Sequence, residues 1–87
     1  MKALVKPIHV MTGKRNMAGE CPVALAVQHA FDDSSIKVLG GKSPNGKPTY
    51  VVYIDELWCP LSQEVSDAVY KFDQTGKMET PLEVEIE

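Results

Sequence analysis

Residues 36–54 read Ile-Lys-Val-Leu-Gly-Gly-Lys-Ser-Pro-Asn-Gly-Lys-Pro-Thr-Tyr-Val-Val-Tyr-Ile, and this stretch decides the fold. Its two ends, 36–39 and 49–54, are rich in the β-branched and aromatic residues that favour strands. The nine residues between them are mostly turn-forming, and Asn45-Gly46 is a strong short-range hairpin signal. The stretch therefore predicts a β-hairpin with a long, mobile tip.

One helix is predicted on each side of the hairpin. The first, Cys21–Phe31, has proline at its first helical position and stops at the polar run 32–35. The second, Ser62–Gln74, has Ser62 as its N-cap and Gly76 beyond its end. Each shows one apolar stripe at helical spacing. The residues of these stripes are Val23, Ala26, Val27, Ala30 and Phe31, and then Val65, Ala68, Val69 and Phe72.

The two ends of the chain are predicted to be strands. Residues 2–11 are interpreted as an edge strand, or one beginning after Pro7, with Leu4, Ile8 and Val10 on one face. Residues 82–86 alternate apolar residues with glutamates, so one face should be buried and the other wet. Residues 12–20 and 55–60 are interpreted as connections. The expected fold is a single α+β domain over 1–87 in the order β-α-β-β-α-β. About four strands form a small antiparallel, or mixed, sheet packed against two short helices.

Composition limits the classes of function. The chain has 87 residues, a hydrophobic fraction of 44% and a formal charge of −3, which fit one modest globular core. The absence of a basic excess argues against non-specific nucleic-acid binding. A basic patch is still open, because most cations lie in the first half of the chain. These candidates are Lys2, Lys6, Lys14, Arg15, Lys37, Lys42 and Lys47.

The start of the chain has no apolar run of signal-peptide length, and no stretch approaches the ~20 residues of a membrane span. We therefore expect a cytoplasmic protein that does not contact a membrane. In a reducing compartment Cys21 and Cys59 should remain thiols.

No motif carries a complete set of catalytic or cofactor-binding residues. Gly40-Gly41-Lys42-Ser43 resembles the end of a phosphate-binding loop, but the earlier glycine of that motif is Ile36 here and no helix can follow. The cysteines and histidines lack the close pairs of a structural zinc site, so no metal or cofactor is expected. The acidic pairs 32–33 and 55–56 are interpreted as turns.

Cys21 is the best chemical candidate, because a thiol at a helix start can have a lowered pKa. A nucleophile also needs a base, and His29 lies eight residues further along the same helix, about 12 Å away. A buried, structural cysteine is therefore the favoured interpretation, and a reactive thiol remains the alternative.

The aromatic residues Tyr50, Tyr53 and Trp58 offer a surface candidate. Tyr50 lies on one face of the strand 49–54 and Tyr53 on the other, so the strand should be central. One face should pack on the helices. The other is either partly exposed or forms an interface with Trp58, since Trp and Tyr are typical of interface hot spots. The predicted contact surface consists of Tyr53 and Trp58 with Lys42, Asn45 and Lys47 of the hairpin loop.

Several segments together resemble a family of short bacteriophage and prophage proteins. They are the helix start Cys21-Pro22-Val23-Ala24-Leu25-Ala26, Leu61 with Val65, Phe72-Asp73 before Gly76, and the tail from Pro81 to Ile86. The loop 40–48 is longer here, and the family usually has a short helix at 12–19. The resemblance implies a phage context and supplies no catalytic residue.

The sequence therefore favours a non-enzymatic interaction protein. Its expected partner is a host protein, and it would act as an inhibitor of that protein or of a defence system, as anti-CRISPR proteins do. The alternatives are a thiol-dependent enzyme or redox protein using Cys21, and a nucleic-acid-binding protein. Pairing of an edge strand with a second copy to form a homodimer is also left open.

Overall fold

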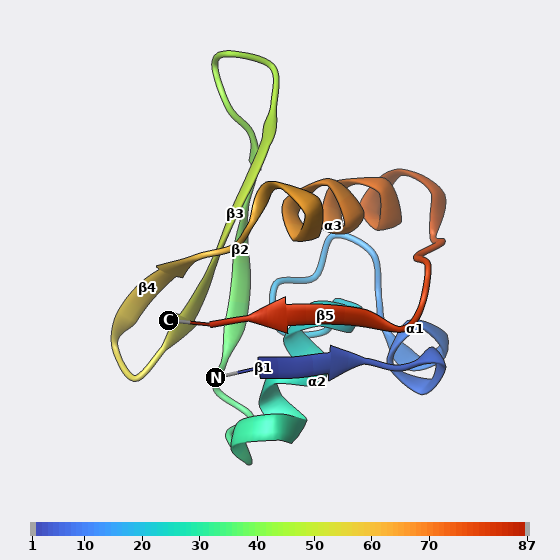
Figure 1. The fold of residues 1–87 in the computed structure, drawn as a ribbon, viewed down its shortest axis with the longest axis vertical. Coiled ribbons are helices and arrows are strands. Elements are labelled where there is room, and N and C mark those ends of the chain that lie inside the picture. The colour runs from blue at the N-terminus through green and yellow to red at the C-terminus, as the bar shows by residue number, and fades with distance from the viewer. Residues whose placement is uncertain (1, 87) are drawn as a thin grey trace.

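The computed structural model of the protein describes residues 2–86. These residues form an α+β fold, as expected, with antiparallel pairing throughout (Figure 1). The structure has more elements than the sequence predicted, and the strands form two sheets rather than one. In chain order they are β1 (Lys2–Val5), α1 (Pro7–Thr12), α2 (Pro22–Phe31), β2 (Lys37–Lys42), β3 (Pro48–Ile54), β4 (Leu57–Pro60), α3 (Gln63–Thr75) and β5 (Leu82–Glu85).

The larger sheet has the order β2-β3-β4, and β1 pairs with β5 in the smaller one. Helices α2 and α3 lie on the same side of the larger sheet, and the tip of the β2–β3 hairpin projects beyond the body of the molecule (Figure 1). Since β3 has a neighbour on both sides, it is the central strand that its apolar composition predicted. The opposite face of this sheet carries no helix within residues 2–86.

The hairpin that decides the fold is confirmed, but the predicted nine-residue tip is wrong, because the strands continue through Gly40 and Gly41 to Lys42 and Pro48. Lys37 pairs with Tyr53, and the ladder continues to Lys42 and Pro48. A three-residue loop closes it, because the N–H of Ser43 donates to the carbonyl of Lys47 and Gly46 adopts a left-handed φ of 85°. Such loops require a residue with positive φ, which explains the glycine.

Both long helices are confirmed, and α3 begins and ends as predicted. The hydroxyl of Ser62 accepts the N–H of Val65 at 3.2 Å, and Gly76 ends the helix with a φ of 74°. The predicted stripe on α2 is partly wrong, because Ala24 is buried and Ala30 is exposed. The difference arises because β1 and β2 both contact α2, which widens its buried side toward its N-terminus.

The prediction of one strand over residues 2–11 is wrong. The strand ends at Val5, and Pro7 is the first residue of the short helix α1. Proline suits that position, and the ring Nδ1 of His9 accepts the N–H of Lys6 at 2.9 Å, which satisfies a donor at the helix start. The six residues of α1 are too few to show a helical period in the sequence. Leu4 and Ile8, which were predicted to share one face of a strand, therefore belong to different elements, and both are exposed.

The interpretation of residues 55–60 as a connection is also wrong, because Leu57–Pro60 forms β4. Ile54 pairs with Leu57 across a two-residue turn in which Asp55 and Glu56 have φ values of 51° and 64°. This is the conformation of a type I′ turn, which normally contains Asn-Gly or Asp-Gly. Without the glycine, residues 55–56 carry no hairpin signal in the sequence.

The strained turn gives a testable prediction. Glu56→Gly should raise the free energy of unfolding by about 0.5–1 kcal/mol, because glycine adopts positive φ without the cost paid by other residues. Denaturant unfolding measures the change. The matched control is Glu64→Gly in the first turn of α3, which should lower stability by a similar amount because glycine disfavours helices. A lower free energy of unfolding in Glu56→Gly would contradict the positive φ of Glu56 in this turn.

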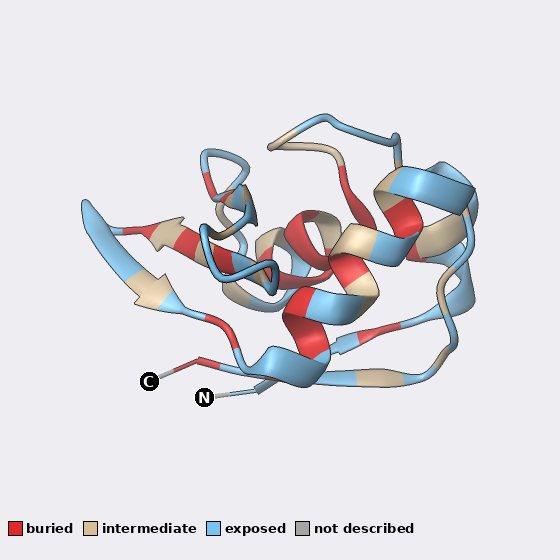
Figure 2. Cartoon of the chain, turned by 90° about the horizontal axis from the view of Figure 1, so that it is seen from above, coloured by how far each residue is buried: buried red, intermediate tan, exposed pale blue. Residues whose placement is uncertain are grey.

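The core lies between the two helices and the two sheets. Buried residues alternate with less buried ones along β3 and follow one side of α3 (Figure 2). Alternation on β5 is confirmed too, since Val84 and Ile86 are buried while Glu83 and Glu85 are exposed. One polar contact inside the core was not predicted. The buried hydroxyl of Ser66 on α3 accepts the N–H of Tyr50 on β3 at 3.2 Å and ties the helix to the sheet.

Candidate functional sites on the two faces of the larger sheet

The uncovered face of the β2-β3-β4 sheet brings Tyr53 and Trp58 together. They are paired across β3 and β4, and their ring centroids lie 4.6 Å apart at an interplanar angle of 48°. Trp58 is nevertheless 58% exposed and Tyr53 is half-buried. The pair therefore presents aromatic surface to solvent, as the sequence predicted for this strand face.

Further apolar side chains continue this surface. Residues directly opposite each other in antiparallel strands point to the same side, so Leu39, Val51 and Pro60 form a row next to the aromatic pair. Leu39 and Val51 are half-buried and Pro60 is exposed. We call this surface the outer sheet face, made of Leu39, Val51, Tyr53, Trp58 and Pro60. The exposed Lys37, which is paired with Tyr53, lies at its edge.

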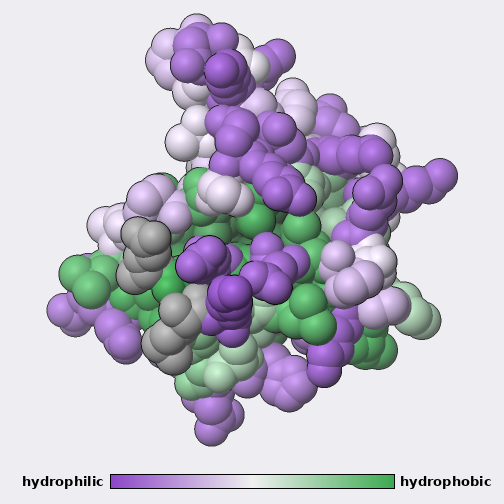
Figure 3. Space-filling view, viewed as in Figure 1, coloured by the Kyte–Doolittle hydropathy of each residue, from purple (hydrophilic) through white to green (hydrophobic). Residues whose placement is uncertain are grey.

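The hairpin residues of the predicted contact surface lie elsewhere. Lys42, Asn45 and Lys47 belong to the projecting tip, which is strongly hydrophilic (Figure 3). The tip joins β3 at Pro48, five residues from Tyr53, which corresponds to roughly 17 Å along a strand. The sequence grouped these residues with the aromatic pair, but the structure places the two groups at opposite ends of β3.

The side chain of Asn45 has a role within the tip itself. Its carbonyl oxygen accepts the hydroxyl of Ser43, and it also accepts the N–H of Lys47 at 3.1 Å. These bonds hold the loop in shape. Lys42 and Lys47 are the charged groups that the tip presents to solvent.

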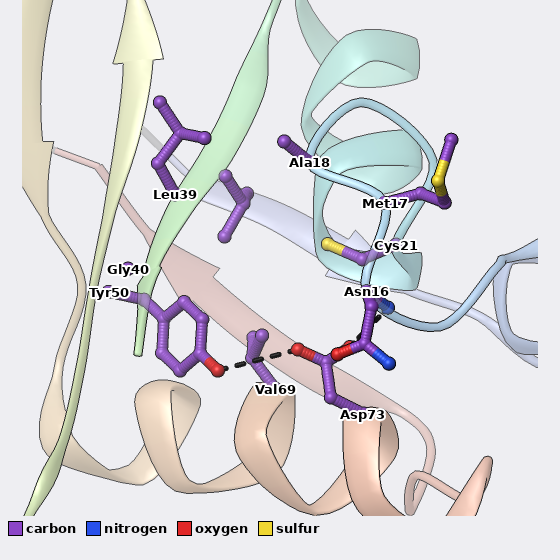
Figure 4. A pocket seen from close by; sticks show the side chains of 10 residues that line it. Asn16, Met17, Ala18, Cys21, Leu39, Gly40, Tyr50, Val69 and Asp73 are labelled. Atoms are coloured by element: carbon purple, nitrogen blue, oxygen red, sulfur yellow. Dashed lines mark hydrogen bonds between the residues drawn. The ribbon is translucent and has the colours of Figure 1, made fainter. Parts of the chain in front are cut away.

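A pocket of about 200 Å³ lies on the inner side of the same sheet. It is enclosed by the loop before α2, by β2 and β3, and by α3. Cys21, Tyr50 and Asp73 meet there from three different elements (Figure 4). The other lining residues used below are Asn16, Met17 and Val38.

Asp73 is the polar centre of this pocket. Its Oδ1 accepts the N–H of Asn16 at 2.9 Å, and its Oδ2 accepts the hydroxyl of Tyr50 at 3.4 Å. Before the structure, Asp73 stood out only as part of the segments that resemble the phage proteins. No local pattern could indicate its role, because its partner Asn16 lies 57 residues away in the chain.

Cys21 fills the N-cap position of α2, where its Sγ accepts the N–H of Ala24 at 3.4 Å. The side chain is buried, and this burial raises the pKa of the thiol to about 11, with the charge of Asp73 adding to the effect. Bonds from the helix N–H groups act in the opposite direction but are outweighed. The environment of Cys21 is thus the reverse of that of an activated nucleophile.

The thiol can be tested directly. At pH 8 a pKa of about 11 leaves roughly one Cys21 side chain in a thousand as thiolate. Cys21 should therefore react with a disulfide reagent far more slowly than the half-buried Cys59. Its reaction rate should be set by the rate at which the protein unfolds locally or globally and exposes the thiol. Stopped-flow measurements on Cys21→Ser and Cys59→Ser separate the two thiols. Rapid reaction of Cys21 in the folded protein would contradict this description.

The predicted basic residues do not form one patch. Lys2 and Lys14 make ion pairs with Glu83 and Glu20, at 3.1 Å and 3.6 Å. Arg15 donates to the carbonyl oxygens of Asp73 and Gln74, at the C-terminal end of α3. Lys42 and Lys47 project at the hairpin tip, far from the others. Lys6 lines the same groove as Lys2, and Lys37 is paired with Tyr53 on β3, so the cations lie on several surfaces.

The two histidines lie together, with ring centroids 6.0 Å apart. Burial lowers the pKa of His9, and His29 and Lys6 add to the shift. Within residues 2–86, no three His, Cys, Asp or Glu side chains lie close enough together to bind one metal ion. Nor does this part of the chain contain a helix long and apolar enough to cross a membrane.

The fold and these sites define a small α+β protein with an exposed apolar sheet face. Comparison of the chain with protein-family models, with curated proteins and with solved structures found no match.

Proposed function

We propose that the protein acts by binding another protein, and that the outer sheet face is its contact surface. The observation that carries this proposal is the Tyr53–Trp58 pair, which holds a 58% exposed tryptophan in a fixed position on a sheet. Rigid aromatic side chains supply much contact area at low entropic cost, and Trp and Tyr dominate interface hot spots.

The face suits this role better than the strand edges. β4 has four residues and ends in Pro60, which lacks an N–H, so its free edge offers little to an added strand. On the other edge, the N–H of Val38 donates to the carbonyl of Ala18 at 2.9 Å. A partner is therefore expected to pack on side chains rather than to extend the sheet, which also disfavours a homodimer built by strand pairing.

The proposed partner is a host protein, with the chain acting as an inhibitor of that protein or of a defence system. This part of the proposal rests on the resemblance to short phage proteins. A thiol-dependent role is disfavoured by the burial of Cys21 and its raised pKa. A nucleic-acid-binding role is disfavoured by the dispersed cations and the two ion pairs.

Removal of the aromatic anchor tests the surface. The immobilised wild-type chain should retain a protein from bacterial lysate that Trp58→Ala fails to retain, because truncation of a hot-spot residue costs at least about 2 kcal/mol, or roughly thirtyfold in affinity. Mass spectrometry and surface plasmon resonance provide the measurements. Trp58→Ala should fold normally, since its side chain is mostly exposed.

Lys47→Ala is the matched control. It removes an exposed side chain from the same hairpin but at the distant tip, so it should leave binding within about threefold of wild type. Loss of binding in Lys47→Ala with retention in Trp58→Ala would move the contact surface to the tip and contradict the proposal.

A further inference from the structure

The inner pocket carries a negative charge that no cation neutralises within residues 2–86. The two ion pairs within residues 2–86 join Lys2 to Glu83 and Lys14 to Glu20, and neither involves Asp73. Arg15 is close, but its donors go to the backbone carbonyl oxygens of Asp73 and Gln74 rather than to the carboxylate. Asp73 also lies in the last turn of α3, and Arg15 binds the backbone at this negative end of the helix dipole.

The carboxylate of Asp73 still has acceptor capacity. A carboxylate offers about four acceptor positions, and Asp73 uses one for the N–H of Asn16 and one for the hydroxyl of Tyr50. Both donors are neutral, so they orient the group without cancelling its charge. The raised pKa of about 12 for Tyr50 and about 11 for Cys21 means that both side chains stay neutral at pH 7.

Part of the wall around this charge is apolar. Val38 comes from β2, Val69 from α3, and the 48% exposed Met17 lies at the loop. The volume of about 200 Å³ equals that of roughly six or seven liquid waters, and therefore accommodates a short alkyl chain with one polar head. Figure 4 shows Asp73 and Tyr50 meeting in this space with the sulfur of Cys21 close by.

From this arrangement we infer that the pocket binds a primary alkylammonium group. The ammonium contacts the carboxylate of Asp73, and the aliphatic chain packs against Met17, Val38 and Val69. An ammonium suits the site better than a guanidinium. A bidentate arginine would need the remaining acceptor positions on both carboxylate oxygens at once, whereas an ammonium binds as a point charge and needs only one of them. The ammonium belongs either to a free amine or to a lysine side chain of a partner.

Titration of the wild-type chain with n-butylammonium chloride tests the inference by two-dimensional amide NMR at pH 7. Shift changes should centre on Asn16, Met17, Cys21, Tyr50 and Asp73. The neutral isostere n-butanol should bind roughly tenfold more weakly, because it lacks the charge-assisted hydrogen bond to the carboxylate, which contributes about that factor to the affinity. Raising the salt from 20 to 500 mM should weaken butylammonium binding and leave butanol unchanged.

Asp73→Asn removes the charge, keeps an oxygen for the N–H of Asn16 and places an NH₂ group that can donate to the hydroxyl oxygen of Tyr50, so it should reduce butylammonium binding to the level of butanol. Equal binding of butylammonium and butanol to the wild type would overturn the inference without any variant. So would shift changes centred on the separate acidic groove lined by Glu64, Asp67 and Glu79.

Two further probes distinguish the sources of the ammonium. Binding of Nα-acetyl-lysine amide as strongly as butylammonium assigns the site to a partner's lysine side chain, because the mouth then admits a backbone. Binding of butylammonium and spermidine without the lysine derivative assigns it to a free amine. The site lies on the opposite side of the sheet from Trp58, so Trp58→Ala should leave amine binding unchanged, and the two proposals fail independently.

Discussion

Gly40→Ala should lower the free energy of unfolding by at least about 3 kcal/mol, a large part of the stability of so small a domain. Gly40 adopts a φ of +148°, where residues with a side chain are strained. A Cβ there would lie 2.2 Å from the carbonyl oxygen of Thr49 and 2.8 Å from Cα of Tyr50. Both atoms belong to the backbone of the paired strand, so β2 and β3 would have to separate locally. Urea unfolding followed by circular dichroism measures the loss.

The neighbouring glycine provides the control. A Cβ at Gly41 would meet nothing within 4 Å, so Gly41→Ala should be neutral or stabilising by a few tenths of a kcal/mol. Equal stability of the two variants would show that the close approach of β2 and β3 at Gly40 is absent in solution. Strand packing thus explains Gly40 of the apparent phosphate-loop motif, and nothing in the structure requires a glycine at position 41.

Ile36→Ala should have the second largest effect, a loss of about 3 kcal/mol. Ile36 is fully buried and belongs to the core cluster, although it lies just before β2. Its backbone is fixed as well, since Nε2 of Gln28 donates to the carbonyl of Ile36 and to that of Gly19, both at 2.8 Å. With its surroundings held in this way, the site cannot collapse around the missing atoms, and most of the cavity should remain.

Leu57→Ala removes a similar aliphatic group from a side chain that is 64% exposed. It should change stability by less than about 0.5 kcal/mol. Thermal unfolding of both variants gives the comparison, with a fall in Tm of more than about 10 °C expected for Ile36→Ala alone. A similar small effect from both substitutions would contradict the position of Ile36 in the core.

The elements that the sequence predicted correctly carry several local signals that agree. Helix α3 has a capping serine, an apolar stripe and a terminal glycine, and all three are observed. The hairpin 36–54 combines strand composition with Asn45-Gly46. Where one local signal stood alone, it was misread. Pro7 begins a helix that is too short to show a period, and residues 55–56 form a tight turn without its usual glycine.

The division into two sheets had no local signal. β1 and β5 are the first and last elements, and their pairing depends on packing over α2 rather than on either strand's own sequence. The candidate sites show the same contrast. Tyr53 and Trp58 could be grouped from the sequence because they lie five residues apart, although the turn that pairs them was not predicted. The Asn16–Asp73–Tyr50 contacts join three distant segments, so only the fold reveals them.

The central claim is that the outer sheet face becomes buried when the protein binds its partner. Trp58 is the only tryptophan in the chain, so biosynthetic 5-fluorotryptophan places one fluorine probe on that face. We expect one ¹⁹F NMR signal that responds to solvent in the free protein. On saturation with the protein retained in the capture experiment, it should shift and broaden and lose its response to replacement of H₂O by D₂O. An unchanged, solvent-responsive signal in the saturated complex would contradict the claim.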